Sequence, residues 1–136
     1  MHCLDANALI DYLHGEEAIG EFVRARSADL FFSPTVALHA VFIGAARLRG
    51  ASGVAAARED LDWVEPLPLT VDAGVEAALI DAELHEVGTP IGSLDTLIAG
   101  TVRSEGGTIV TRDGHFERVE NLEVRRYRNE SDDACD

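Results

Sequence analysis

The stretch MHCLDANALIDYL at residues 1–13 decides the fold. Its apolar run ends at Asp5, as expected for a short strand, and Leu9, Ile10 and Leu13 then recur with the spacing of one helix face. A strand that passes directly into a helix is the first unit of an alternating α/β fold. The acid at this junction lies where such folds collect ligands, beyond the carboxyl end of a strand.

The remaining segments continue this alternation. Short apolar or β-branched runs predict further strands at 30–34, 64–69, 108–111 and 122–127. Helix spacing predicts helices at 7–15, 16–27, 34–49, 55–64, 71–88 and 93–107, the last with Ser93 as its N-cap. This order predicts an α/β fold with a mainly parallel sheet of four or five strands, covered on both faces. We expect one domain over residues 1–128 and an acidic, disordered tail over 129–136.

The composition is strongly acidic and lacks lysine. The 136 residues carry 25 Asp and Glu against 11 basic side chains, all of them Arg, for a net charge of −14. This balance is typical of adaptation to high salt, or of an acidic protein from a GC-rich genome in which Arg codons replace Lys. It argues against a broad surface that coats nucleic acid, but it is compatible with a local site lined by arginines.

The sequence also indicates where the protein resides. Cys3 and Cys135 give no disulfide framework, which favours a reducing cytoplasm. The N-terminus lacks the basic region and cleavage site of a signal peptide, and no apolar run approaches the ~18 residues of a membrane span. We therefore expect a cytoplasmic protein without a membrane segment.

Three acids differ in position from the solvated majority. Asp5 and Asp113 each follow a predicted strand, and Asp95 lies in the first turn of a predicted helix. Each of the three acids also has a purely structural explanation. Asp5 can cap the helix that follows it, Asp95 can interact favourably with the positive N-terminus of its helix, and Asp113 can begin an Asp-Gly turn. Together, however, they predict a cluster of carboxylates at one edge of the sheet.

A carboxylate cluster indicates metal chemistry. Neighbouring carboxylates repel one another unless a cation neutralises them, so they either raise their own pKa values or bind metal. Oxygen ligands favour Mg²⁺ or Mn²⁺, which retain waters, bridge to phosphates and activate water against a phosphodiester. The five histidines are scattered, and the sequence contains no P-loop, GxSxG motif or Ser-His-Asp order.

Three segments in combination resemble the PIN-domain ribonucleases and, within them, the VapC-type toxins of toxin–antitoxin pairs. They are LDANALIDYL at 4–13, LDTLIAGTV at 94–102 and IVTRDGHFERV at 109–119. The resemblance extends over residues 1 to about 127 and implies a PIN-like (Rossmann-like) three-layer α/β/α domain with a Mg²⁺ or Mn²⁺ site. It also implies endoribonuclease activity on structured RNA such as tRNA or rRNA, with 5′-phosphate and 3′-hydroxyl products. A homodimer and a VapB-type antitoxin whose tail blocks the site are further implications.

The resemblance assigns roles to particular residues. Asp5, Asp95 and Asp113 match the family's metal-binding, catalytic acids. Groups that support these ligands or bind substrate are expected at four further positions, Asn7, Ser93, Thr111 and Arg112. Of these, Thr111 can orient Asp113, and Arg112 either meets a phosphate or is an ordinary surface residue.

A fourth family acid is missing. The family carries a Glu four residues before a Gly-Ala pair in the helix after the second strand. Here Gly44-Ala45 places Ala40 at that position. We therefore expect a metal-dependent endoribonuclease toxin whose activity is weakened or absent as written. The alternative is a non-catalytic PIN-fold module that binds RNA or an antitoxin.

Ala40 lies within a run from Leu30 to Arg58 that contains no acid. Part of this run is explained if the helix at 34–49 is packed on both sides. Three accounts of Ala40 are open: an engineered Glu→Ala variant that spares its expression host, a natural member that does not cleave, or a different register in which Glu59 approaches the site.

Two further inferences concern substrate and function class. A protein of this charge must segregate its arginines to hold RNA, and the candidates to line the approach are Arg47, Arg49, Arg103, Arg112 and Arg118. A phospho-accepting, receiver-like domain also gathers acids at strand ends, but it needs a Lys that this chain lacks.

Overall fold

A computed structural model describes residues 1–128 and is built around one parallel sheet. Its strands are β1 (His2–Leu4), β2 (Phe31–Pro34), β3 (Val64–Leu67), β4 (Thr108–Thr111) and β5 (Glu123–Arg126). Their order is β3-β2-β1-β4-β5, and every neighbouring pair is parallel. The carboxyl ends of all five strands therefore meet at one edge, as the predicted alternation requires.

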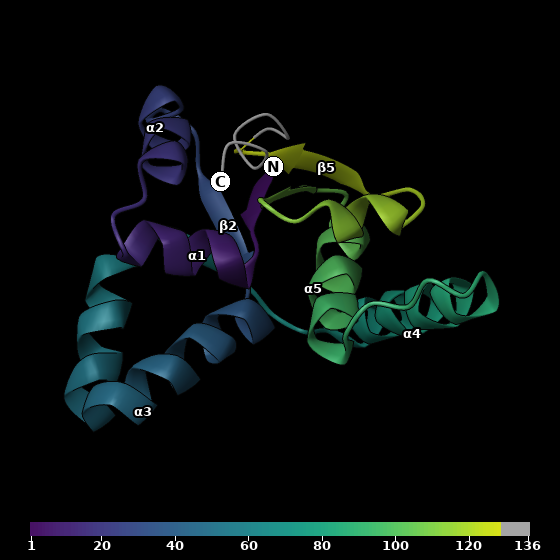
Figure 1. Ribbon diagram of the computed structural model, residues 1–136, viewed down its shortest axis with the longest axis horizontal. Coiled ribbons are helices and arrows are strands. Elements are labelled where there is room, and N and C mark those ends of the chain that lie inside the picture. Colours follow the sequence, from purple (N-terminus) through teal and green to yellow (C-terminus); the bar gives the residue numbers. More distant parts are fainter. Residues whose placement is uncertain (129–136) are drawn as a thin grey trace.

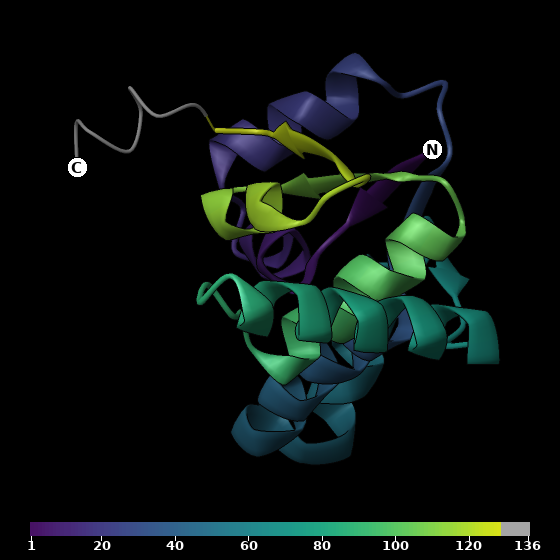
Figure 2. The same cartoon turned by 90° about the vertical axis from the view of Figure 1, so that its right-hand side faces the viewer.

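Helices cover both faces of this sheet. They are α1 (Ala6–Leu13), α2 (Glu17–Ala25), α3 (Thr35–Asp60), α4 (Val71–Glu86), α5 (Ser93–Ser104) and the 3₁₀ helix η1 (Gly114–Arg118). The sheet lies between α1 and α2 on one side and α4 and α5 on the other (Figure 1). Figure 2 shows that α4 and α5 lie together, with α3 extending beyond them. The predicted three-layer α/β/α class is confirmed.

The central strands are buried because both faces are covered. Cys3, Leu4, Ile109 and Val110 have no exposed surface. On one face, the Phe22 ring of α2 lies 5.6 Å from the ring of His2. The apolar run of residues 108–111 is thus a core strand, as its β-branched composition predicts.

Gly100 in the LDTLIAGTV segment allows α4 and α5 to approach closely. A Cβ atom at Gly100 would lie 2.5 Å from the backbone nitrogen of Ala77 in α4. No real Cβ tolerates that distance, so glycine is required for the two helices to cross here. The carboxyl half of α5 is thereby held against α4, and its first turn points to the carboxyl edge of the sheet.

Helix α3 consists of two arms joined by a sharp turn, visible as the bend at the lower left of Figure 1. Gly50 has φ 60° and ψ −144°, a conformation essentially confined to glycine. The arms lie close, because a Cβ atom at Gly53 would be 2.5 Å from the carbonyl oxygen of Ala45. The two helices predicted at 34–49 and 55–64 correspond to these arms, but the second arm begins earlier, after Gly50, and ends earlier, at Asp60.

The first arm of α3 is not packed on both sides, so that expectation is wrong. Only Ala37 and Val41 are buried within it, whereas Ile43 and Leu48 are exposed by 37 % and 85 %. The arm projects from the sheet, and one side of it faces solvent. Core packing therefore does not explain why the run from Leu30 to Arg58 contains no acid.

Two other predictions concern chain boundaries. Ser93 is not the N-cap of α5, because Gly92 takes that position without a side-chain cap and Ser93 is the first helical residue. The tail predicted at 129–136 lies outside the described residues. Within residues 1–128, no helix combines the length and apolar character needed to cross a membrane.

Candidate active site at the carboxyl edge of the sheet

Asp5 lies at the end of the central strand and begins α1. Its side chain caps the helix, because Oδ1 accepts a hydrogen bond from the Ala8 backbone N–H at 2.8 Å. Its Oδ2 accepts a bond from the Thr111 hydroxyl at 2.6 Å, and the residue is only 2 % exposed. The capping explanation is therefore correct, and the same carboxylate lies at the carboxyl edge of the sheet, where the site is predicted.

The environment of Asp5 disfavours its charged form. Burial raises the pKa of Asp5 to about 7, although the hydrogen bonds from Thr111 and Ala8 oppose this shift. The negative charges of Asp113 and Asp95 raise the pKa of Asp5 further. The three acids predicted to cluster thus lie within electrostatic range of one another, in a region that would favour a bound cation.

The Asp113 side chain is bound by Asn7, which lies near the other end of the described chain. The Asn7 side-chain amide donates to its carboxylate, and its own backbone N–H donates to Thr111 Oγ1 at 3.0 Å. Thr111 is fully buried and bonds to both Asp5 and the Asp113 backbone. Asn7 and Thr111, both predicted to support the acids, therefore join the start of the chain to residues that follow β4.

Asp95 lies in the first turn of α5 and faces His115, which the sequence did not single out. Asp95 Oδ2 is 3.1 Å from His115 Nε2, and the two side chains are 34 % and 26 % exposed. The contact with Asp95 raises the pKa of His115, burial partly offsets the rise, and the charges of Asp113 and Asp5 add to it. The one available signal was that His115 follows Asp113 by two residues within IVTRDGHFERV.

Arg112 is bound to a buried acid that the sequence also did not single out. Its Nη1 donates to Asp11 Oδ1 at 2.9 Å, and the Tyr127 hydroxyl donates to Asp11 Oδ2 at 2.5 Å. Arg112 remains 38 % exposed, whereas Asp11 is 6 % exposed. Burial and the neighbouring Asp11 raise the pKa of the Tyr127 phenol. Arg112 is therefore neither buried nor an ordinary surface residue.

Other predicted residues lie apart from these acids. Ser93 is exposed, and its carbonyl accepts a bond from the Thr96 hydroxyl at 2.7 Å. Arg103 lies at the far end of α5 and pairs with Glu76 at 2.7 Å, so it does not line an approach to Asp95. Eight residues of helix separate Asp95 from Arg103, or about 12 Å along the axis.

Ala40 faces α1 rather than the core. It is half-buried and lines an apolar groove of about 260 Å³ together with Ile10 and Leu13 of α1. Ile10 follows Asn7 by three residues, about 4.5 Å of helix rise. Position 40 therefore lies beside the carboxyl half of α1, the helix that Asp5 caps at its amino end.

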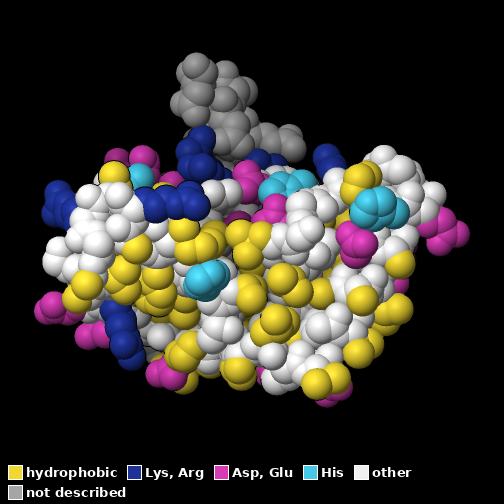
Figure 3. All heavy atoms as spheres, turned by 90° about the horizontal axis from the view of Figure 1, so that it is seen from below, with side chains coloured by type: hydrophobic (Ala, Val, Ile, Leu, Met, Phe, Trp, Pro, Cys, Tyr) yellow, Lys and Arg dark blue, Asp and Glu magenta, His cyan; other side chains and the backbone are white. Residues whose placement is uncertain are grey.

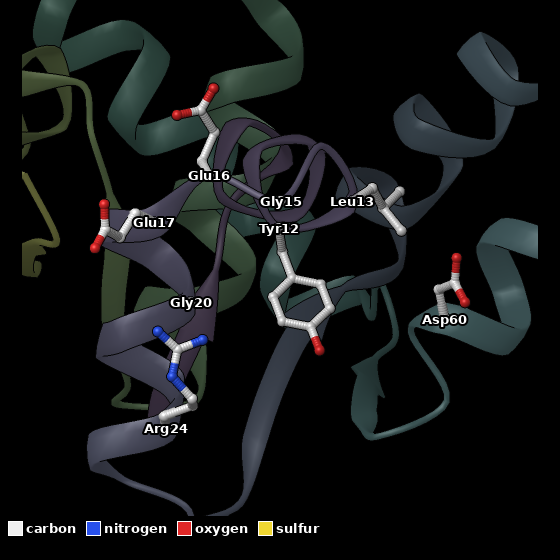
Figure 4. Close-up of a pocket in the computed structure, with 8 residues that line it drawn as sticks. All are labelled: Tyr12, Leu13, Gly15, Glu16, Glu17, Gly20, Arg24 and Asp60. Carbon is white, nitrogen blue, oxygen red and sulfur yellow. The ribbon is translucent and has the colours of Figure 1, made fainter.

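Glu59 is exposed near the carboxyl end of α3. Its neighbour Asp60 lines a different cavity, together with Tyr12, Glu16 and Arg24 (Figure 4). Tyr12 belongs to the carboxyl end of α1, whereas Asp5 caps its amino end. The end of α3 thus lies beside the carboxyl end of α1, in a different cavity from the groove that Ala40 lines.

The residues at this edge are suited to a hard cation by their chemistry. Asp5, Asp95 and Asp113 supply carboxylate oxygens, and the pKa of Asp5 is raised mainly by burial, with a smaller contribution from the charges of Asp113 and Asp95. Within residues 1–128, no three Asp, Glu, His or Cys side chains converge closely enough to form a closed metal-binding group. Mg²⁺ retains several of its waters in proteins, so an open set of carboxylates is compatible with it.

The chain is similar to known proteins over most of its length. The model of the family described as PIN domain matches residues 2–122. The tRNA(fMet)-specific endonuclease VapC of Salmonella typhimurium is 26 % identical over 126 residues, which are 91 % of this chain and 96 % of that protein.

Solved structures extend the comparison to three dimensions. DNA-bound VapBC from Salmonella typhimurium is 25 % identical with a TM-score of 0.83, covering 93 % of this chain and 98 % of that one. VapBC2 from Rickettsia felis, bound to a promoter DNA fragment, is 18 % identical with a TM-score of 0.84, covering 92 % and 97 %. At that lower identity the likeness concerns the fold alone.

Proposed function

The chain belongs to the PIN domain family, and from this membership we propose that it is a metal-dependent endoribonuclease toxin of the VapC type. One observation carries the proposal. Asp5 and Asp113 are joined through Thr111 and Asn7 at the carboxyl edge of the sheet, and Asp95 faces the same region from α5. A nuclease of this class needs carboxylates near one point, and the electrostatic effect of Asp95 and Asp113 on Asp5 supports this edge as that point.

The proposed ligands are Asp5, Asp95 and Asp113, and the proposed ion is Mg²⁺ or Mn²⁺. When bound, such an ion activates water and stabilises charge on the phosphodiester. Thr111 keeps the Asp5 carboxylate in one orientation by donating to Oδ2, and Asn7 does the same for Asp113. Arg112, which remains partly exposed, is suited to bind a substrate phosphate.

The proposed substrate is structured RNA, and the proposed location is the cytoplasm. The VapC relative from Salmonella typhimurium is a tRNA(fMet)-specific endonuclease. We extend the class, not the particular tRNA, to this chain, and include rRNA in it. Binding of RNA to a protein with a charge of −14 depends on local arginines such as Arg112.

The presence of Ala40 at the position of the family's Glu favours a second candidate function, that of a non-catalytic module that binds RNA or an antitoxin. The test is Mn²⁺-dependent RNA cleavage by the wild type, Ala40→Glu and Ala40→Gln. We expect Ala40→Glu to cleave on the order of 100-fold faster than the other two, because only Glu adds a carboxylate beside α1. Gln is the matched control, since it has the same length without the charge.

Each other outcome has a definite meaning. Equal cleavage by all three proteins would show that position 40 does not matter and that the Gly44 register is wrong. No cleavage of any RNA by Ala40→Glu would favour the non-catalytic module. Cleavage that persists in Ala40→Glu/Asp5→Asn would identify a contaminating nuclease.

We propose that two copies of the chain associate through α4. Val71, Val75 and Leu79 recur every four residues on this helix and are exposed by 84 %, 52 % and 49 %. Figure 3, which views the molecule from the side of α3 and α4, shows hydrophobic side chains spread across this face. Exposed apolar patches of this kind mark interaction surfaces, and a symmetric dimer would cover the stripe with itself.

We propose a VapB-type antitoxin as the other partner. The similar structures from Salmonella typhimurium and Rickettsia felis are VapBC assemblies. The surface we assign to the antitoxin is the groove between α1 and α3, where Leu48 is 85 % exposed beside Ile10 and Leu13. An apolar segment of the partner would cover these side chains.

A further inference from the structure

A buried acid beside the proposed site has no part in the proposed chemistry. Asp11 lies on α1, and its side chain is 6 % exposed. Both of its carboxylate oxygens are occupied, by Arg112 Nη1 at 2.9 Å and by the Tyr127 hydroxyl at 2.5 Å. Removing one partner of such a group leaves the other uncompensated, so the three side chains form one unit.

One donor, Arg112, belongs to the segment that carries Thr111 and Asp113, and the other, Tyr127, is bonded to that segment. Arg112 stands between Thr111 and Asp113 in the chain. The Tyr127 backbone N–H donates to the Thr111 carbonyl at 3.2 Å, which ties the residue after β5 to the end of β4. Asp11 therefore connects α1, the helix of Asp5 and Asn7, to the ends of β4 and β5.

A further contact supports the same segment. Arg126 Nη2 donates to the carbonyl oxygen of Arg112 at 3.1 Å. The backbone of Arg112 is thus held by β5, while its side chain is held by α1. Asp113 follows Arg112 directly, so the position of Asp113 depends on both of these contacts.

We propose that Asp11 is a positioning residue for the proposed site. By holding Arg112 and Tyr127 against α1, it sets where Asp113 stands relative to Asp5. It also orients Arg112, which keeps N–H groups for a substrate phosphate. The inference rests on the proposed function for its chemical meaning, but the placement of Asp113 can be measured without it.

A second acid–arginine pair provides a matched comparison. Arg103 Nε donates to Glu76 Oε2 at 2.7 Å, and the Arg103 side chain is 11 % exposed. This pair also joins two elements, α4 and α5, but it lies about 12 Å along α5 from Asp95. Its loss should affect stability without affecting the proposed site.

The experiment compares the full-length wild type with Asp11→Asn, Tyr127→Phe and Glu76→Gln. The first readout is amide hydrogen exchange at Asp113 and Tyr127 by NMR, without metal. The second is Mn²⁺ affinity from the electron paramagnetic resonance signal of free Mn²⁺. We expect Asp11→Asn to speed exchange at both amides and to weaken Mn²⁺ binding, each on the order of 10-fold. Tyr127→Phe should cause smaller changes in the same direction, and Glu76→Gln should cause neither.

The inference is overturned if folded Asp11→Asn retains wild-type exchange at Asp113 and wild-type Mn²⁺ affinity. It is also overturned if Glu76→Gln reproduces the losses of Asp11→Asn, because the role would then be general stability. Should Asp11→Asn fail to fold, the same two readouts on Tyr127→Phe decide. If the wild type binds no Mn²⁺, the metal part of the proposed function fails, and amide exchange alone decides the inference.

Discussion

At the scale of single residues, Asp5 combines a structural role as a helix cap with an unusual pKa. The same carboxylate caps α1 and accepts from Thr111, and burial raises its pKa to about 7. A capping acid on a helix surface would keep an ordinary pKa. The unusual value arises because the cap stands at the centre of the sheet, where two further acids are near.

This pKa predicts how stability depends on pH in the absence of divalent cations. The folded pKa of Asp5 is about 7, against 3.8 for an unperturbed aspartate side chain. Between these values the folded state holds a proton that the unfolded state releases, so the free energy of unfolding falls as pH rises through the window. One such group contributes a slope of at most about 1.4 kcal/mol per pH unit. Urea unfolding in a chelator, from about pH 4 to pH 8, measures the slope.

Asp5→Asn is the control for this measurement. Asn keeps an acceptor for the Ala8 N–H and does not titrate. The variant should therefore lose the Asp5 component of the slope and be at least as stable as the wild type near neutral pH. Identical slopes in the two proteins would contradict the assigned environment of Asp5.

Individual residues show which parts of the candidate site could be predicted from the sequence and which could not. Asp5, Asp95 and Asp113 were found because they stand beside predicted strands and helices, where local pattern suffices. Asp11 and His115 were not found because their partners, Arg112 and Asp95, are distant in sequence. Only the packed fold brings these pairs together, and no local pattern encodes it.

At the scale of elements, the strands and most helices can be predicted from the periodicity of apolar residues, whereas the turns and caps at their ends cannot. The two arms of α3 were predicted as separate helices, but the left-handed turn at Gly50 and the solvent-facing side of the first arm were not. Ser93 was predicted as an N-cap from its type, whereas Gly92 takes that position. These details depend on how elements pack, which apolar spacing does not specify.

The crossing of α4 and α5 predicts a large effect from one methyl group. In Gly100→Ala the new Cβ would meet the Ala77 backbone at 2.5 Å, so the helices must separate. Overpacking of this kind destabilises by about 1–3 kcal/mol. Gly74→Ala is the control, because that helical glycine has no atom within 4 Å of its Cβ position. It should be neutral or stabilise by up to about 1 kcal/mol. Urea unfolding distinguishes the two, and equal effects would contradict the close crossing.

At the scale of the whole molecule, charge and apolar surface act on association in opposite directions. Each copy carries a net charge of −14, whereas the α4 stripe is apolar. Repulsion between two copies is screened by salt, and burial of the stripe is not. The composition that suggested a high-salt protein therefore also predicts a dimer that strengthens with salt.

The dimer prediction is tested with Val75→Asp/Leu79→Asp. Two new charges on the stripe should convert the protein to a monomer, measured by light scattering after size exclusion at moderate salt. Leu48→Asp is the control, because it places a charge on an exposed apolar residue outside the stripe. It should leave the dimer intact and weaken capture of a VapB-type antitoxin. A double variant that remains dimeric would exclude α4 as the interface.

Two side-chain hydrogen bonds, Asn7 to Asp113 and Thr111 to Asp5, each join residues that are 106 positions apart, and this has a consequence for folding during translation. A chain leaving the ribosome presents Asp5 and Asn7 first, yet their partners Asp113 and Thr111 are translated near the end. The central strand β1 also lacks its neighbour β4 until then. Domains generally fold as units during translation, at roughly 5–20 residues per second. A nascent chain of this protein would therefore be harmless to the RNA around it until the last strands emerge. During that delay, a partner protein that is already present could bind the chain before the proposed site is complete.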